Sequence, residues 1–113
     1  MPAETKRYCL ALDLKNDHRL IEAYKSHHQK VWPEIVKSIR DADIVSMEIY
    51  QVENRLFMIM ETGPGFSFEK KANDDLQNQK VREWEQLMET YQQLLPGTSK
   101  NEKWRLMERI FLL

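Results

Sequence analysis

The chain opens with a two-residue alternation of hydrophobic and polar positions. Between Lys6 and Leu14 the apolar members of this alternation are Tyr8, Leu10, Leu12 and Leu14. Because successive side chains of a β-strand point to opposite faces, the pattern predicts a strand with one strongly apolar face. Asn16 or Asp17 then predicts a helix start, since a short polar side chain accepts hydrogen bonds from the free amides of a first turn.

A three- and four-residue spacing of apolar positions replaces the alternation from Leu20 onward, and it is typical of an amphipathic helix. The positions on this stripe are Ile21, Tyr24, His28, Val31, Ile35 and Ile39. Pro33 interrupts the pattern, because proline cannot donate a hydrogen bond to the carbonyl four residues earlier. The sequence therefore predicts either a kink or a second helix with Pro33 in its first turn.

The segment from Ala42 to Thr62 predicts a β-hairpin. Apolar and polar residues alternate in its first half, and Glu53-Asn54 stands where the turn is needed. The second strand, Leu56–Met60, is apolar on both faces, which is typical of a strand covered on both sides. Two glycines between Thr62 and Phe68 predict a loop.

The last third of the chain predicts two helices and a strand. The polar stretch from Glu69 to Lys80 predicts a short helix followed by a flexible connection. Helical spacing then runs from Val81 to Leu95, where Pro96-Gly97 ends the helix. The apolar segment Lys103–Leu113 predicts a final strand.

This order of elements predicts a ferredoxin-like βαββαβ domain of the α+β class, with helices on one face of an antiparallel sheet. A length of 113 residues suits one domain spanning residues 1–113. Two helices can cover only one sheet face, yet Leu56–Met60 and Leu106–Leu113 are apolar on both. We therefore expect a homodimer in which a second subunit covers the other face.

Composition narrows the possible partners. The chain is 42% hydrophobic and 31% charged with a net charge of −1, so no general attraction to nucleic acid or to a membrane is expected. No apolar run is long enough to span a bilayer, and no signal-peptide core is recognisable near the N-terminus. The single cysteine, Cys9, allows no intrachain disulfide. A cytoplasmic location is the default expectation.

Two of the three histidines, His27 and His28, are adjacent and lie between Tyr24 and Trp32. The helical phase directs His28 toward the core and His27 toward the edge of the apolar stripe. His28 is therefore either a structural residue with a satisfied hydrogen bond or a proton-transfer group, and its position leaves both readings open. Adjacent histidines splay apart on a helix, and no HxxxH or HExxH pattern is present, so no metal site is expected.

The segment "YKSHHQKVWPE", together with "MEIY", "NRLFMIME", "REWEQLM" and "RIFLL", resembles the L-rhamnose mutarotase family from Arg7 to Leu113. The resemblance implies a dimeric α+β barrel that interconverts the α and β anomers of a 6-deoxy hexose without a cofactor. It also implies that His28 is the proton-donating histidine, that Tyr24 contacts the sugar, and that Trp84 is the first residue of a sugar-binding Trp pair.

Two positions depart from the family pattern. Glu85 stands in place of the second tryptophan of the pair, and Met47 stands in place of a sugar-contacting tyrosine on the hairpin. Tyr50 keeps a nearby family tyrosine. The implied substrate-binding set is therefore Tyr24, Met47, Tyr50, Trp84 and Glu85, and the sugar can be L-rhamnose or a relative such as L-fucose.

Two other functions fit the same predicted scaffold. A haem-handling or small-molecule monooxygenase of the α+β barrel type would use a helix histidine as an iron ligand, because a fold does not determine an activity. A non-catalytic sugar-binding module would bind the sugar and leave its rate of anomer exchange unchanged.

Overall fold

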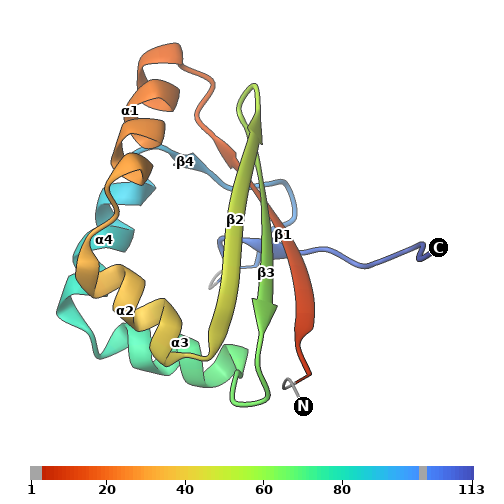
Figure 1. Cartoon of the computed structure of the whole chain (residues 1–113). Helices are drawn as coiled ribbons and strands as arrows, with labels where there is room; N and C mark the ends of the chain where they lie inside the picture. Colours follow the sequence, from red (N-terminus) through yellow and green to blue (C-terminus); the bar gives the residue numbers. More distant parts are fainter. Residues whose placement is uncertain (1–3, 100–101) are drawn as a thin grey trace.

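A computed structural model describes residues 4–99 and 102–113, so Met1–Ala3 and Lys100–Asn101 of the expected domain lie outside the described residues. In chain order its elements are β1 (Lys6–Leu14), α1 (His18–Gln29), α2 (Pro33–Asp41), β2 (Ile44–Val52), β3 (Arg55–Thr62), α3 (Phe68–Leu76), α4 (Gln79–Glu89), β4 (Gln92–Gln93) and β5 (Arg105–Leu106). The strands form one sheet in the order β2-β3-β1-β4, and β5 also pairs with β1. Figure 1 shows the helices on one side of this sheet, which confirms the predicted α+β arrangement.

The core lies between the helices and one face of the sheet. β1 and β3 pair antiparallel so that Leu12 stands opposite Leu56, and these two side chains are 0% and 2% exposed. A cluster here called the upper core joins the sheet to α1, α2 and α4; its buried members are Leu14, Tyr24, Ile35, Leu56, Val81, Trp84 and Met88. Full burial of one such aliphatic side chain contributes roughly 1.5–3 kcal/mol, so this cluster fixes the histidine-bearing helix on the sheet.

The predicted break at Pro33 is a junction between two helices. Asp17 caps α1 by accepting hydrogen bonds from the amides of Arg19 at 2.9 Å and Leu20 at 3.3 Å. α1 ends at Gln29, and α2 begins with Pro33 in its first turn. Both the predicted cap and the alternative of a second helix are confirmed.

The predicted hairpin is also confirmed. Its turn places Glu53 at φ 51°, in the left-handed region. The Asn54 side chain donates a hydrogen bond to the carbonyl of Leu14 at 3.1 Å, which ties the turn to the end of β1.

The helix predicted over Val81–Leu95 is too long, because α4 ends at Glu89. The next residues return to the sheet: the carbonyl of Tyr91 accepts from the Lys15 amide at 2.9 Å, and Gln92 pairs with Leu14. Helical spacing continues in the sequence because Tyr91 packs against the same upper core without being helical. The predicted short helix before α4 is confirmed as α3, and a junction capped by Asn78 replaces the predicted flexible connection.

The strand predicted over Lys103–Leu113 is also too long. β5 covers only Arg105–Leu106, and one further bond joins the Met107 amide to the Cys9 carbonyl at 2.8 Å. Beyond it, Ile110–Leu113 are 72–107% exposed, and Figure 1 shows this segment leading away from the sheet on the side opposite the helices. An apolar run predicts burial, but its pattern does not say which surface will cover it.

The outer face of the sheet, turned away from the helices, is only partly covered. β1 and β3 place Cys9, Ala11, Phe57 and Ile59 there, and all four are of intermediate exposure. This agrees with the second apolar face inferred from the sequence. Within the described ranges, no helix has the length and apolar character needed to cross a membrane.

Candidate active site

His28 lies in the last turn of α1 between two aromatic rings. Its ring centroid is 4.4 Å from that of Tyr24 and 5.7 Å from that of Trp84, the latter in an edge-on arrangement at 68°. Its Nδ1 atom lies 2.9 Å from the backbone carbonyl of Tyr24. Because a carbonyl only accepts, Nδ1 carries the proton of this bond, and Nε2 of the neutral ring carries the lone pair.

The surroundings favour the neutral form of His28. Burial lowers the pKa of His28 below its ordinary value of 6.5, the hydrogen bond to the Tyr24 carbonyl opposes this, and positive charge on His27 lowers the pKa further. The imidazole is therefore uncharged at neutral pH, with Nε2 able to accept a proton.

Tyr24 is almost completely enclosed, with 3% of its surface exposed. Burial raises the pKa of Tyr24 to about 12, a hydrogen bond from the Gln92 side chain opposes this, and the negative charge of Glu85 adds to it. The phenol thus keeps its proton at neutral pH. The Oε1 atom of Gln92 is buried and has no hydrogen-bond partner among the described residues.

His27 points in a different direction, as the helical phase predicts. Its Nε2 atom is 3.1 Å from the Tyr91 hydroxyl, and the two ring centroids are 5.5 Å apart. Tyr91 follows α4, so this bond connects α1 to the chain segment that returns to the sheet. His27 has a structural partner that accounts for its position.

Trp84, on α4, is part of the upper core and is 6% exposed. Its ring contacts His28 and also Trp32, whose centroid lies 5.2 Å away at 69°. The structure therefore brings Tyr24, His28 and Trp84 together. Trp84 is more deeply buried than an aromatic ring that stacks on a sugar from the solvent side would be. Trp32, four residues after His28 in the sequence, reaches Trp84 from the N-cap position of α2 and not from the helix that carries His28.

Glu85 is held by a residue that the sequence did not single out. The Lys103 ammonium lies 2.9 Å from Glu85 Oε2 and 2.8 Å from Glu89 Oε1. Lys103 is 18 residues from Glu85 along the chain, so spacing could not reveal this contact.

The two hairpin residues lie on opposite faces of the sheet. Met47 faces the helices and packs beside a second cluster that includes Met58 and Met60. Tyr50 is 55% exposed on the outer face, where its hydroxyl donates to Glu48 Oε2 at 2.7 Å. A single chain therefore does not bring Tyr50 to His28.

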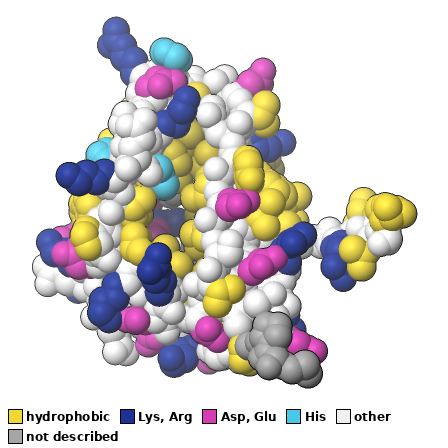
Figure 2. Space-filling view, viewed as in Figure 1, with side chains coloured by type: hydrophobic (Ala, Val, Ile, Leu, Met, Phe, Trp, Pro, Cys, Tyr) yellow, Lys and Arg dark blue, Asp and Glu magenta, His cyan; other side chains and the backbone are white. Residues whose placement is uncertain are grey.

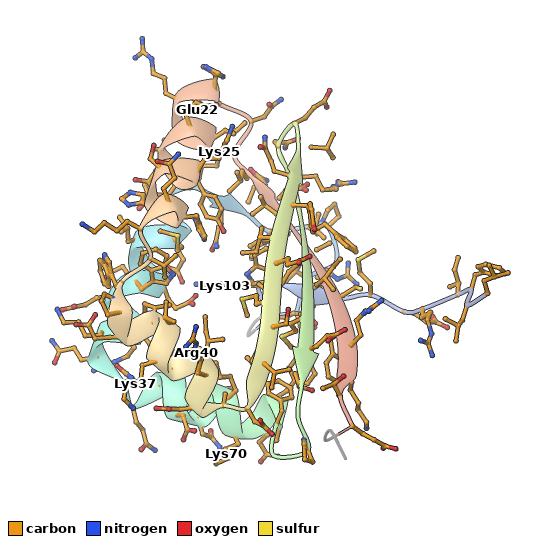
Figure 3. All side chains as sticks on the ribbon, in the orientation of Figure 1. Glu22, Lys25, Lys37, Arg40, Lys70 and Lys103 are labelled. Atoms are coloured by element: carbon orange, nitrogen blue, oxygen red, sulfur yellow. The ribbon has the colours of Figure 1, made fainter. Side chains whose placement is uncertain are left out.

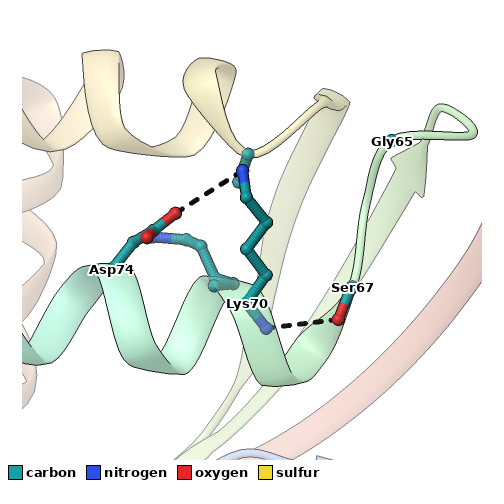
Figure 4. A pocket seen from close by; sticks show the side chains of 6 residues that line it. Gly65, Ser67, Lys70 and Asp74 are labelled. Carbon is teal, nitrogen blue, oxygen red and sulfur yellow. Dashed lines mark hydrogen bonds and ion pairs between the residues drawn. The ribbon is translucent and has the colours of Figure 1, made fainter.

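The molecule is hollowed between its helical layer and β2, with histidine and hydrophobic atoms on the rim and charged atoms at the bottom (Figure 2). Figure 3, in the same orientation, places Lys103 in this gap. A separate shallow depression lies at the start of α3 and is lined in part by Gly65 and Ser67 (Figure 4). Its lysines are already paired with carboxylates, as in the Lys70–Asp74 contact at 3.8 Å, and it does not adjoin the histidines.

Comparison with known proteins agrees with the resemblance seen in the sequence. Residues 7–113 match the family model for L-rhamnose mutarotase. An L-fucose mutarotase from Xanthomonas campestris pv. campestris is 40% identical over 110 residues, covering 96% of this chain and 88% of that protein. A UPF0734 protein from Dictyostelium discoideum is 34% identical over 113 residues, covering 94% and 88%.

A solved structure supports the fold. The crystal structure of an L-rhamnose mutarotase from Formosa agariphila matches with a TM-score of 0.71 at 22% identity, covering 96% of this chain and 98% of that one. The family model spans nearly all of the chain, and the fold agrees with it. The chain therefore belongs to the L-rhamnose mutarotase family of sugar isomerases.

Proposed function

We propose that this protein interconverts the α and β anomers of a 6-deoxy-L-hexose, with His28 transferring the proton. One observation carries this proposal: the Nδ1 atom of His28 is committed to the Tyr24 carbonyl at 2.9 Å, which leaves Nε2 for a substrate. Burial lowers the pKa of His28 and so favours the neutral ring, which can accept a proton. A positioned imidazole of this kind contributes about 10²–10⁴-fold to a proton-transfer reaction.

The proposed reaction needs only proton transfers. Nε2 of His28 accepts the proton of the anomeric hydroxyl, a carbonyl forms at C1, and the electron pair of the C1–ring-oxygen bond passes to the ring oxygen. The imidazolium then gives its proton to that oxygen, and the ring is open. Both oxygens are bonded to C1, so one nitrogen can serve both.

Ring closure reverses these steps after the aldehyde group has turned. Rotation about the C1–C2 bond presents the other face of the carbonyl to the hydroxyl that reforms the ring. His28 therefore acts first as a base and then as the acid implied by the family resemblance.

The binding residues are proposed from their surroundings. Tyr24 and Trp84 are the aromatic neighbours of the His28 ring, and aromatic faces suit the C–H faces of a pyranose. Glu85 offers carboxylate oxygens that can accept from neighbouring sugar hydroxyls. Met47, on β2, contributes an apolar side chain on the sheet face that is turned toward the helices. Tyr50, exposed on the outer face, is not included in this single-chain site.

L-fucose and L-rhamnose are the proposed substrates, and L-fucose is the first to test. A relative that is 40% identical is named an L-fucose mutarotase, whereas the family model is that of L-rhamnose mutarotase. Both sugars carry a methyl group at C5 and differ in their ring hydroxyls at C2 and C4. A carboxylate at position 85 recognises hydroxyls rather than C–H faces, so preference is expected to depend on Glu85.

Saturation-transfer NMR tests the function directly. Wild-type protein should accelerate exchange between the two anomeric signals of L-fucose and L-rhamnose. His28→Asn should remove most of this acceleration, His27→Ala should remove much less, and His18→Asn serves as an exposed control on the same helix. Equal activity of the His28 and His27 variants would overturn the assignment.

The same experiments separate the competing functions. A sugar-binding module would shift sugar signals without accelerating exchange. A haem-handling protein would acquire a Soret band with haem and show no exchange.

We also propose a homodimer formed through the outer sheet face. Phe57 and Ile59 lie there among partly exposed apolar neighbours, and the C-terminal Ile110–Leu113 are exposed on the same side (Figure 1). Covering these groups would remove apolar surface from water. Light scattering at micromolar concentration should give twice the chain mass, and Ile59→Lys should halve it. Val36→Lys, on α2, is the matched control, and a wild-type monomer at every concentration would refute the dimer.

A further inference from the structure

Lys103 connects the helical layer to the sheet across the hollow. Its ammonium contacts Glu85 and Glu89 on α4 at 2.9 and 2.8 Å. The residue that follows it, Trp104, packs against the buried clusters on both halves of the sheet, and Arg105 then pairs with β1. The backbone at Lys103 is thus fixed near the sheet while its charged end reaches the helices, as Figure 3 shows.

This ion pair differs from the surface pairs of the same protein. The Lys103 side chain is 29% exposed, whereas that of Lys37, which pairs with Asp41 on α2, is 75% exposed. Burial alone would lower the pKa of Lys103, but hydrogen bonds to Glu89 and Glu85 outweigh it and raise the pKa. The ammonium is therefore charged at neutral pH, and its position is set by two carboxylates.

Glu85 lies on the same helix as Trp84, whose ring centroid is 5.7 Å from that of the His28 imidazole. Its charge also reaches the Tyr24 hydroxyl, where it contributes to the raised pKa of that group.

We propose that Lys103 is a positioning and specificity residue: it holds the Glu85 carboxylate in the hollow so that this carboxylate can accept hydrogen bonds from adjacent ring hydroxyls of the bound sugar. The ammonium has three N–H donors, and its two carboxylate partners leave one for a sugar oxygen. The proposal rests on the mutarotase function proposed above.

The alternative role for Lys103 is purely structural, and the two roles predict different measurements. A partly exposed ion pair contributes little to stability, so loss of the lysine leaves the protein folded. A structural role would leave the apparent affinity and the sugar preference unchanged in the folded variant. A positioning role changes both while sparing the proton transfer at His28.

The experiment compares Lys103→Met with Lys103→Arg, using Lys37→Met as the control for loss of an ion pair remote from the hollow. Anomer exchange is measured by NMR over a range of L-fucose and L-rhamnose concentrations, and circular dichroism verifies folding. Lys103→Met should raise KM for the preferred sugar roughly tenfold, which is the scale of one lost hydrogen bond to a charged group, and change kcat less than threefold. It should also shift the ratio of kcat/KM for the two sugars.

Two further variants test the link to Glu85. Lys103→Arg keeps the charge and should recover most of the affinity, while Glu89→Gln should have a smaller effect than Glu85→Gln. Glu85→Gln should reproduce the Lys103→Met effect, and combining the two should add little, because both act through one carboxylate.

The outcomes are distinguishable. An active wild type together with a folded Lys103→Met variant of unchanged KM and unchanged sugar ratio overturns the role of Lys103 alone. A wild type that binds these sugars without exchanging their anomers overturns the mutarotase function, and sugar titration of Lys103→Met still tests the contact. A wild type that neither binds nor exchanges either sugar overturns both.

Discussion

Trp84→Ala is expected to destabilise the protein severely. Trp84 is 6% exposed in the upper core, where its ring contacts His27, His28 and Trp32. A buried aromatic side chain removes about 150–250 Å² from water, which corresponds to about 4–6 kcal/mol at 25 cal/mol per Å². Measured truncations of buried Phe or Trp to Ala cost about 3–5 kcal/mol, so the two estimates agree.

A loss of this size is a large part of the total stability of a small domain, which is typically about 5–15 kcal/mol. Urea unfolding followed by circular dichroism gives the free energy directly, at one fixed protein concentration so that association does not enter the comparison. The melting temperature should fall by about 12–20 °C, at about 4 °C per kcal/mol. Leu76→Ala, which truncates a 69% exposed side chain on α3, is the control and should change stability by less than about 0.5 kcal/mol.

A destabilisation below about 1 kcal/mol for Trp84→Ala would refute the structural reasoning, because it would mean that the ring is not enclosed. The variant also bears on the sugar site. If the folded fraction of Trp84→Phe, which retains a ring in the cluster, binds sugar with unchanged affinity, then Trp84 supports His28 and does not contact the sugar.

Three further predictions concern His28 and the loop after β3. Since burial lowers the pKa of His28, kcat/KM should stay level as pH falls to about 6.5 and decline only below it, and a decline centred above that value would contradict a neutral base. The unfolded chain binds a proton at His28 more readily, so the unfolding free energy should fall as pH drops below about 6.5 until the folded pKa is passed, and His28→Gln should flatten this slope. Gly63→Ala should cost about 1–3 kcal/mol in urea unfolding, because a Cβ there would lie 2.7 Å from Asp43 Cγ and displace the carboxylate that accepts from the Gly65 amide; an unchanged midpoint would contradict it.

Sequence reasoning succeeded where local chemistry determines structure. Strand alternation, the Asp17 cap and the Pro33 helix start each depend on a few neighbouring residues, and all three are found. The errors lie at the end of α4 and in the C-terminal strand. There the deciding contacts are long-range, as in the pairing of Gln92 with Leu14, and apolar spacing alone does not reveal them.

The residues of the candidate site also fall into two groups: those whose proximity local spacing predicts, and those brought together by long-range contacts. His28 and Tyr24 are four residues apart on one helix, so helical phase alone predicts that their rings are neighbours. Lys103 and Tyr91 follow α4, and they come close to the site because the chain returns to the sheet there. Their partners, Glu85 and His27, are 18 and 64 residues away, and neither contact has a sequence signature.

The two adjacent histidines differ in the groups that their ring nitrogens contact. His27 has its Nε2 atom bonded to the Tyr91 hydroxyl, a contact that fastens α1 to the segment beyond α4. His28 uses Nδ1 for its own helix backbone and has Nε2 left for chemistry. Positive charge on His27 also lowers the pKa of His28, after the larger effect of burial, so the neighbour favours the neutral form of the His28 ring. The pair is therefore asymmetric in geometry: one imidazole is bonded through Nε2 to Tyr91, and the other keeps an Nε2 atom without a hydrogen bond among the described residues.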